Sequence, residues 1–190
     1  MRCDIRPMLH LDNGFDLRPA DAGDAGDAGD AGDAARIAVW MAQPHVRQWW
    51  HQDWSVERWT EEIARQAAGE HSIPCVAAVD AEDFGYVELY RVRHDRLAEY
   101  YASDDHDWGV HVAIGDLTRV GRGLGRQLLR ALADALLRAD PACQRVVAEP
   151  DVGNTPSVRA FAAAGFVQQG ELQLPEKTAQ LMVRTRTVEA

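Results

Sequence analysis

A glycine-rich segment, Val120-Gly-Arg-Gly-Leu-Gly125, follows an apolar run and precedes a leucine-rich helical pattern. Glycines let a backbone approach an anion closely, and the first amides of a helix point at it with the positive end of the dipole. Arg122 and Arg126 add cations that suit phosphate groups. The segment lacks the Gly-Lys-Ser/Thr of a P-loop and the spacing of a dinucleotide fingerprint. It predicts another kind of phosphate-binding loop or, as the plain alternative, a tight turn.

Two ionisable residues, His111 and Asp151, lie in or just after two of the predicted strands. His111 is inside the apolar run 108–114, and Asp151 follows the run 145–148. Strands joined by one crossover helix tend to be neighbours, so both side chains are expected at one sheet end, where open α/β sheets place active sites. The plain alternatives are a hydrogen-bonded core histidine and an Asx turn or helix cap at Asp151.

The elements that must position these residues alternate between strand and helix patterns. The expected strands are 14–18, 73–79, 85–92, 108–114, 145–148, 166–174 and 179–185. The expected helices are 34–41, 57–68, one that the glycine segment 121–125 opens and Asp140-Pro141 ends, and 157–164. This order predicts an α/β fold with one mixed sheet and helices on both faces.

A low-complexity stretch divides the chain near its start. Residues 21–33 repeat Asp-Ala-Gly, and we expect a flexible, solvated insert there. The predicted organisation is an N-terminal strand region at 1–20, the insert at 21–33, and the remainder of a single domain at 34–190.

Composition excludes several classes of protein. The chain has 190 residues, 46% of them apolar, and a net charge of −10, which argues against nucleic-acid binding. No apolar run is long enough for a membrane span or signal peptide. Cys3, Cys75 and Cys143 are widely spaced, which predicts no disulfide and no thiolate zinc site, and Cys75 and Cys143 are expected to be packed in the core. We therefore expect a cytoplasmic protein.

Five of the six tryptophans fall within residues 40–59. Tryptophan buries a large area and seeks a partner for its N–H group. Two interpretations stay open: the rings cap the core, or some of them line a substrate cleft.

The glycine segment with its strand and helix, followed by 154–166 (Asn-Thr-Pro-Ser-Val-Arg-Ala-Phe-Ala-Ala-Ala-Gly-Phe), resembles the two core motifs of the GCN5-related N-acetyltransferase (GNAT) superfamily. The resemblance implies the GNAT fold, a mostly antiparallel sheet, and loop amides that hold the pyrophosphate of coenzyme A. The family loop usually begins with Gln or Arg, where this chain has Val120.

Four further motifs, within 86–90, 107–111, 149–154 and 174–182, resemble the siderophore-biosynthesis acyltransferases of the aerobactin, mycobactin and desferrioxamine types. The resemblance covers about residues 46–186. Aminoglycoside 6′-N-acetyltransferases share the Trp-Trp segment, the glycine loop and the chain ending, and they are the close alternative. A catalytically inactive acyl-CoA-binding module is a third.

The resemblance implies direct acyl transfer from an acyl-CoA, with acetyl-CoA or succinyl-CoA expected, to an N-hydroxylated lysine, ornithine or cadaverine. An N-hydroxylated amine is neutral near pH 7, so a weak base suffices, and His111 with an ordinary pKa near 6.5 suits that role. Asp151 would orient His111 or hold the acceptor. Backbone amides of Val112 and Ile114 would hold the pantetheine and polarise the carbonyl. No metal is implied.

The implied coenzyme-binding residues come from the strand, the loop and the second motif: Val112, Ile114, Val120, Gly121, Arg122, Gly123, Leu124, Gly125, Arg126, Asn154, Ser157 and Phe161. The implied acceptor-binding residues are Glu88, Tyr90, Trp108 and Lys177. Lys177, the single lysine, either pairs with a substrate carboxylate or is a solvated turn residue. The expected partner is a small-molecule amine, with no nucleic acid or membrane, for a monomer or weak homodimer.

Overall fold

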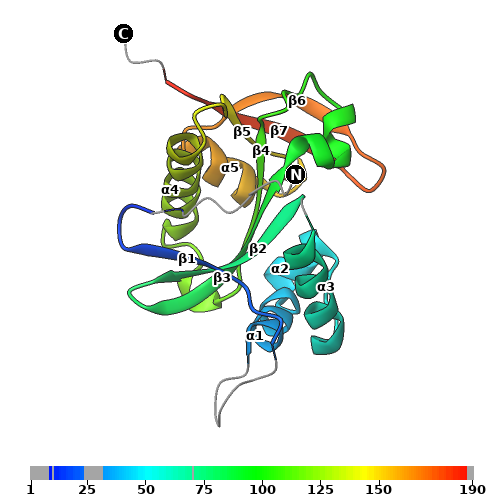
Figure 1. The fold of residues 1–190 in the computed structure, drawn as a ribbon, viewed down its shortest axis with the longest axis vertical. Coiled ribbons are helices and arrows are strands. Elements are labelled where there is room, and N and C mark those ends of the chain that lie inside the picture. Colours follow the sequence, from blue (N-terminus) through cyan, green and yellow to red (C-terminus); the bar gives the residue numbers. More distant parts are fainter. Residues whose placement is uncertain (1–8, 10, 24–31, 70, 188–190) are drawn as a thin grey trace.

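Seven strands form one sheet in the order β1-β2-β3-β4-β5-β7-β6 (Figure 1). The computed structural model describes residues 9, 11–23, 32–69 and 71–187. The strands are β1 (Phe15–Pro19), β2 (Ser72–Val79), β3 (Glu82–Arg91), β4 (Trp108–Ile114), β5 (Arg145–Ala148), β6 (Val167–Gln173) and β7 (Thr178–Thr185). The helices are α1 (Gly32–Met41), α2 (Pro44–Trp50), α3 (Val56–Ala68), α4 (Leu124–Ala139) and α5 (Thr155–Ala163), with short 3-10 turns η1 (Val92–His94), η2 (Arg96–Glu99) and η3 (Leu117–Arg119).

Every strand pair is antiparallel except β4 with β5, which confirms the predicted mixed, mostly antiparallel sheet. The parallel pair is short: only Trp108↔Val146 and Gly109↔Val147 face each other. After Gly109 the pairing of β4 with β5 ends, so a gap in the sheet opens at the carboxyl ends of these two strands.

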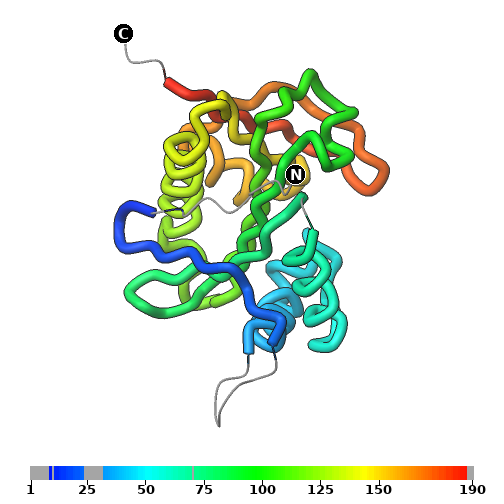
Figure 2. The backbone as a smooth tube through the Cα atoms, viewed as in Figure 1, coloured from blue at the N-terminus to red at the C-terminus, as the bar shows by residue number. Residues whose placement is uncertain are grey.

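Helices cover both faces of the sheet, as predicted. Figure 1 shows α4 and α5 on one side and the group α1–α3 on the other. Figure 2 follows the same chain as a tube and places the β6–β7 hairpin beside the connection between β3 and β4. An ion pair between Arg96 and Glu176 joins these two segments.

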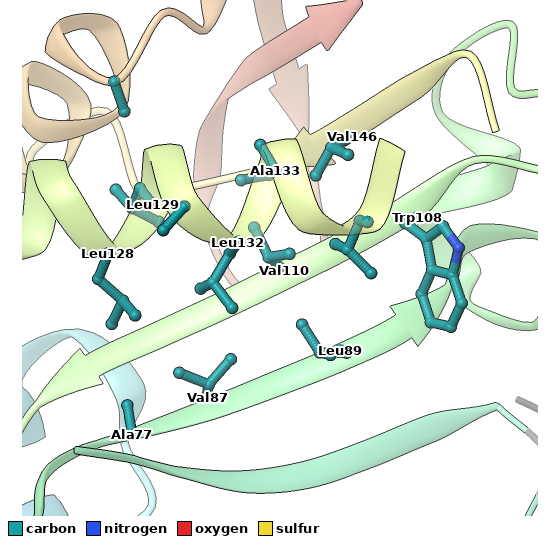
Figure 3. Close-up of a cluster of buried hydrophobic side chains, with 14 of the residues drawn as sticks. Ala77, Val87, Leu89, Trp108, Val110, Leu128, Leu129, Leu132, Ala133 and Val146 are labelled. Atoms are coloured by element: carbon teal, nitrogen blue, oxygen red, sulfur yellow. The ribbon is translucent and has the colours of Figure 1, made fainter. Parts of the chain in front are cut away.

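The larger core lies between α4 and the sheet. Leucines at helical spacing on α4, among them Leu128 and Leu132, are fully buried and point at Val87, Leu89 and Val110 of the strands (Figure 3). Burial of such side chains stabilises the fold by about 1.5–3 kcal/mol each. This packing fixes the glycine segment that precedes α4 against the end of β4.

The segment after α1 differs from the prediction, which ended a helix near Pro44 and placed none directly after it. Pro44 instead begins α2, with Gln43 as its N-cap. Proline lacks an N–H and therefore both stops one helix and fits the first turn of the next. The consequence is functional, because α2 carries Trp49 and Trp50 toward the open side of the sheet.

The Asp-Ala-Gly insert also differs from the prediction, at its last residue. Asp33 was expected to be solvated, but it is buried, and it forms ion pairs with Arg18 and Arg36. Its carboxylate also accepts the amide of Asp21. A buried charge requires such partners, and the repeat concealed this one among similar aspartates. Residues 24–31 of the insert lie outside the described residues.

Cys75 and Cys143 are buried free thiols, as expected, and Cys3 lies outside the described residues. Burial raises the pKa of Cys75 to about 12 and that of Cys143 to about 11, so neither is a thiolate at neutral pH.

Candidate active site

His111 lies where β4 leaves β5, and two strands deliver carboxylates to its ring. Glu88 of β3 faces it directly in the antiparallel register, with Oε2 3.2 Å from Nδ1. The β4–β5 pairs are 38 residues apart in sequence, and the same spacing puts Glu149 opposite His111. Nε2 of His111 donates to Oε1 of Glu149 at 2.6 Å.

Both ring nitrogens of His111 meet carboxylates and so both donate, which is the imidazolium form. Burial alone lowers the pKa of His111, but Glu149 and Glu88 outweigh it and raise that pKa to about 10. Burial raises the pKa of Glu149, yet His111, with lesser help from Lys177 and Tyr90, holds it at about 2. At neutral pH His111 is therefore a protonated, positively charged imidazolium, and Glu149 is a negatively charged carboxylate.

This corrects two expectations for the catalytic pair. His111 does not have an ordinary pKa near 6.5, because its two carboxylate partners stabilise the charged ring. The carboxylates that contact its ring are those of Glu149 and Glu88, not that of Asp151. Asp151 lines the same cavity, but its Oδ1 accepts the amide of Gly153 at 2.7 Å, which is the Asx turn weighed as the alternative.

Tyr90 contacts both members of the pair formed by His111 and Glu149. Its hydroxyl donates to Oε2 of Glu149 at 2.9 Å, and its ring centroid lies 4.7 Å from that of His111. The ring occupies the space above Gly109, where an added Cβ would lie only 2.0 Å from it. Tyr90 was expected in the acceptor pocket. It is buried behind Glu149 instead and does not line the cavity.

A first cavity of about 510 Å³ lies between the ends of β4, α4 and α5, next to α2. Gly121 and Gly123 both have φ near +78°, a left-handed conformation that glycine adopts without strain. No side chain caps the first turn of α4, Gly123 and Gly125 at this helix start line the cavity, and Arg126 and Arg159 add positive charge. These features suit a long ligand with phosphate groups.

The predicted coenzyme residues converge on this first cavity, apart from two. It is lined by Val112, Ile114, Val120, Gly121, Gly123, Gly125, Arg126, Asn154, Ser157 and Phe161. Arg122 is exposed and Leu124 packs on the core, so neither lines it. Sequence reasoning missed Arg159 and His45, which do line it.

The open edge of β4 offers free backbone groups to the first cavity. Just after β4, Gly115 donates its amide to the carbonyl of Phe84 in β3. Because an antiparallel ladder alternates, Val112 and Ile114 turn their peptide groups away from β3, on the side that β5 has left. His45 of α2 donates from Nε2 to the Ile114 carbonyl at 2.9 Å and so fastens α2 across this edge.

A second cavity of about 390 Å³ surrounds the cluster of His111, Glu88 and Glu149. Lys177 also lines it, as predicted. Trp108 does not, because it starts β4 at the far end of the strand. Its indole N–H donates to Asp140, and it is a core residue, which corrects its assignment to the acceptor pocket.

The two cavities share one wall. The side chains that line both are Trp49, Trp50, Val112, Asn154, Ser157 and Phe161. Asn154 also caps α5 by accepting the amide of Ser157. Trp50 stands edge-on to His111, with ring centroids 5.9 Å apart. Trp40 and Trp59 are core residues, whereas Trp49 and Trp50 line the two cavities, and the binding of a substrate there stays a prediction.

The described residues contain neither a membrane-spanning helix nor a metal-ligand cluster. None of the helices among them is long and apolar enough to cross a membrane. Within that part of the chain, no group of three His, Cys, Asp or Glu side chains is placed to hold a metal ion.

Comparisons with known proteins agree on one family. Residues 30–174 match the family model described as "Acetyltransferase (GNAT) domain". The chain is 37% identical to lysine N-acyltransferase MbtK of Mycobacterium sp. (strain MCS) over 181 residues, which is 95% of this chain and 71% of that protein. It is 32% identical to N-hydroxyputrescine acetyltransferase of Acinetobacter baumannii, covering 76% of this chain and 69% of that protein.

A solved structure gives the same result for the fold. The crystal structure of aminoglycoside acetyltransferase AAC(6')-Ib with coenzyme A superposes with a TM-score of 0.76 at 25% identity, covering 90% of this chain and 95% of the other.

Proposed function

This protein belongs to the GNAT acetyltransferase family, and from that premise we propose that it acylates an N-hydroxylated amine at the cluster of His111, Glu149 and Glu88. The enzyme class expected from the sequence, an acyl-CoA-dependent N-acyltransferase of the siderophore branch, is confirmed by the relatives. One observation carries the choice of reacting centre: this cluster lines the second cavity directly beside the wall shared with the first.

The first cavity is the proposed acyl-CoA site. Left-handed glycines, the uncapped start of α4, Arg126 and Arg159 fit the phosphates. The outward peptide groups of Val112 and Ile114 fit the pantetheine arm and polarise the thioester carbonyl. The reactive carbonyl then lies at the shared wall, and its acceptor comes from the second cavity.

The chemistry is attack by the amine nitrogen on the thioester carbonyl. A C–N bond forms, the C–S bond breaks, the nitrogen loses a proton and the sulfur gains one. A neutral N-hydroxylated amine needs no deprotonation before attack, which suits a resting centre whose histidine is already protonated.

Glu149 and His111 together balance these protons. Glu149 accepts the proton that the nitrogen sheds, and the imidazolium of His111 donates one to the departing sulfur. Glu149 then passes its proton back to His111 across the 2.6 Å hydrogen bond between Oε1 and Nε2, which restores the starting protonation states. Glu88 holds the other ring nitrogen and so fixes the ring orientation. The proposal thus assigns the partnership with His111 to Glu149.

Asp151 is proposed to bind the far end of the acceptor. It lines the second cavity, and a carboxylate there suits the distal ammonium of N-hydroxylysine, N-hydroxyornithine or N-hydroxycadaverine. Acetyl-CoA and succinyl-CoA are the proposed donors. A cytoplasmic location, a monomeric or weakly dimeric state, and the absence of nucleic-acid and membrane partners stay predictions.

The test measures thiol release from acetyl-CoA and succinyl-CoA. N-hydroxycadaverine, N-hydroxylysine, N-hydroxyornithine, lysine and kanamycin are offered in parallel, with His111→Ala as the inactive control. We expect turnover with the hydroxylated amines only. Turnover with kanamycin alone would assign the protein to the aminoglycoside acetyltransferases. Coenzyme binding without any thiol release would indicate an inactive acyl-CoA-binding module.

A further inference from the structure

Lys177 lies against the reacting centre because backbone bonds hold its turn there. The β6–β7 turn closes with the Leu174 amide on the Lys177 carbonyl. The start of β7 is tied to the segment after Glu149, with Val152 donating to Thr178 and Gln180 donating to Pro150. As a result Nζ of Lys177 lies 3.8 Å from Oε1 of Glu149.

The ammonium of Lys177 keeps donors to spare. Its side chain is only 23% exposed, and the described residues give it no hydrogen bond, only the 3.8 Å contact with Glu149. A lysine ammonium has three donors, and a mostly buried one gains free energy when a ligand oxygen accepts from it. This lysine faces the second cavity, where a bound acceptor can supply that oxygen.

The charges of the centre are already balanced. Glu149 is matched by His111 and Lys177, and Glu88 by His111, so two carboxylates face two cations. Both oxygens of Glu149 have partners, since Tyr90 donates to the second. The other charges of the cavity are Asp151 near Gly153 and the Arg96–Glu176 pair.

We infer that Lys177 selects N-hydroxylated amines over plain ones, by donating to the hydroxyl oxygen and by leaving neither carboxylate of the His111 cluster unpaired for a protonated reacting amine. A plain alkylamine enters as a cation, and a further cation beside a neutral, half-buried cluster has no partner. The N-hydroxylated nitrogen is neutral, so it brings no second charge beside the cluster, and its hydroxyl oxygen can accept from Lys177. This inference rests on the proposed function and names the residue that sets its substrate class.

The test compares a substrate with its plain counterpart as a competitive inhibitor. KM for N-hydroxycadaverine and the inhibition constant of cadaverine are measured by thiol release for the wild type, Lys177→Met and Lys177→Arg. Arg65→Met is the matched control, because it removes one positive charge from an exposed position of α3 outside both cavities.

We expect Lys177→Met to raise KM for N-hydroxycadaverine and to lower the inhibition constant of cadaverine. The ratio of KM to that inhibition constant should rise about tenfold or more. Lys177→Arg should keep the ratio within a few-fold of wild type, and Arg65→Met should not change it. If Lys177→Met weakens both ligands equally, or neither, the inference is wrong although the enzyme acts on hydroxylated amines. If the wild type fails to turn over any hydroxylated amine, the proposed function is wrong and this inference with it.

Discussion

The ring of His111 is bound on both sides, and its two carboxylates come from different strands. Glu149 is the shorter contact, at 2.6 Å, and is the least exposed of the three side chains. A mechanism that relies on this pair must fail when either member loses its ability to carry charge.

We predict that Glu149→Gln lowers kcat about a hundredfold or more, because general acid–base groups typically contribute about 10²–10⁴. Asp151→Asn should instead raise KM for the acceptor and change kcat less than tenfold. Steady-state kinetics with N-hydroxycadaverine measure both. A loss of kcat in Asp151→Asn as large as that in Glu149→Gln would return the partnership with His111 to Asp151.

The raised pKa of His111 also makes stability depend on pH. The charged ring is favoured in the folded state, so its contribution is complete below the unfolded pKa of 6.5 and is lost as pH rises toward about 10. Wild type should therefore lose more unfolding free energy than His111→Gln between pH 6.5 and 10. Urea unfolding at several pH values measures this, with the exposed His106→Gln as control. Parallel curves for wild type and His111→Gln would contradict the raised pKa.

Sequence reasoning placed His111 and Asp151 together, whereas the structure puts Glu149 against the His111 ring, and the reason is geometric. It placed both residues at one sheet end without knowing the β4–β5 register, and a parallel register is not encoded by spacing alone. Glu149 was visible only as part of a motif. Lys177 was located correctly, yet its contact with Glu149 depends on β7 pairing beside residues 150–152.

Among the secondary-structure elements, those with a regular apolar pattern were predictable from the sequence, and the helix that directly follows another at a proline was not. The four-residue strand β5 and the strand β4 have the expected bounds. The glycine segment begins α4 as expected, with left-handed glycines. Helix α2 was missed because one proline both ends α1 and begins it, and Trp108 was misassigned because its strand position faces the core.

The contact between β3 and β4 at Gly109 gives a prediction for this level. Gly109→Ala puts a Cβ into the Tyr90 ring, so the ring must move and its hydrogen bond to Glu149 must break. We expect a loss of about 1–3 kcal/mol in unfolding free energy, as for other overpacked sites, together with reduced kcat. Urea unfolding and kinetics measure the two effects.

Tyr90→Phe separates the two parts of that prediction. It keeps the ring and removes only the hydroxyl that donates to Glu149. Its kcat should fall as in Gly109→Ala, with a smaller loss of stability. Wild-type stability in Gly109→Ala would show that the strands can absorb the added methyl group.

Across the whole molecule, Asp33 joins the first strand to the first helix. It pairs with Arg18 of β1 and Arg36 of α1, and both arginines also reach Asp83 of β3. Asp33→Asn should cost about 2 kcal/mol, less than a fully buried pair, because Arg18 is 46% exposed. Chemical denaturation measures it against Asp53→Asn, an exposed pair with Arg47 expected to change stability by less than about 0.5 kcal/mol. Equal effects of the two variants would contradict a structural role for Asp33.

The wall common to both cavities has a thermodynamic consequence. Trp49, Trp50 and Phe161 touch whatever occupies either side, so each ligand meets a surface that the other has already ordered. Linkage then requires reciprocity: the factor by which coenzyme A changes affinity for the amine equals the factor by which the amine changes affinity for coenzyme A. Calorimetric affinities for each ligand, with and without the other, measure this factor. If the proposed function holds, a factor different from one would be carried by the three aromatic rings of the shared wall.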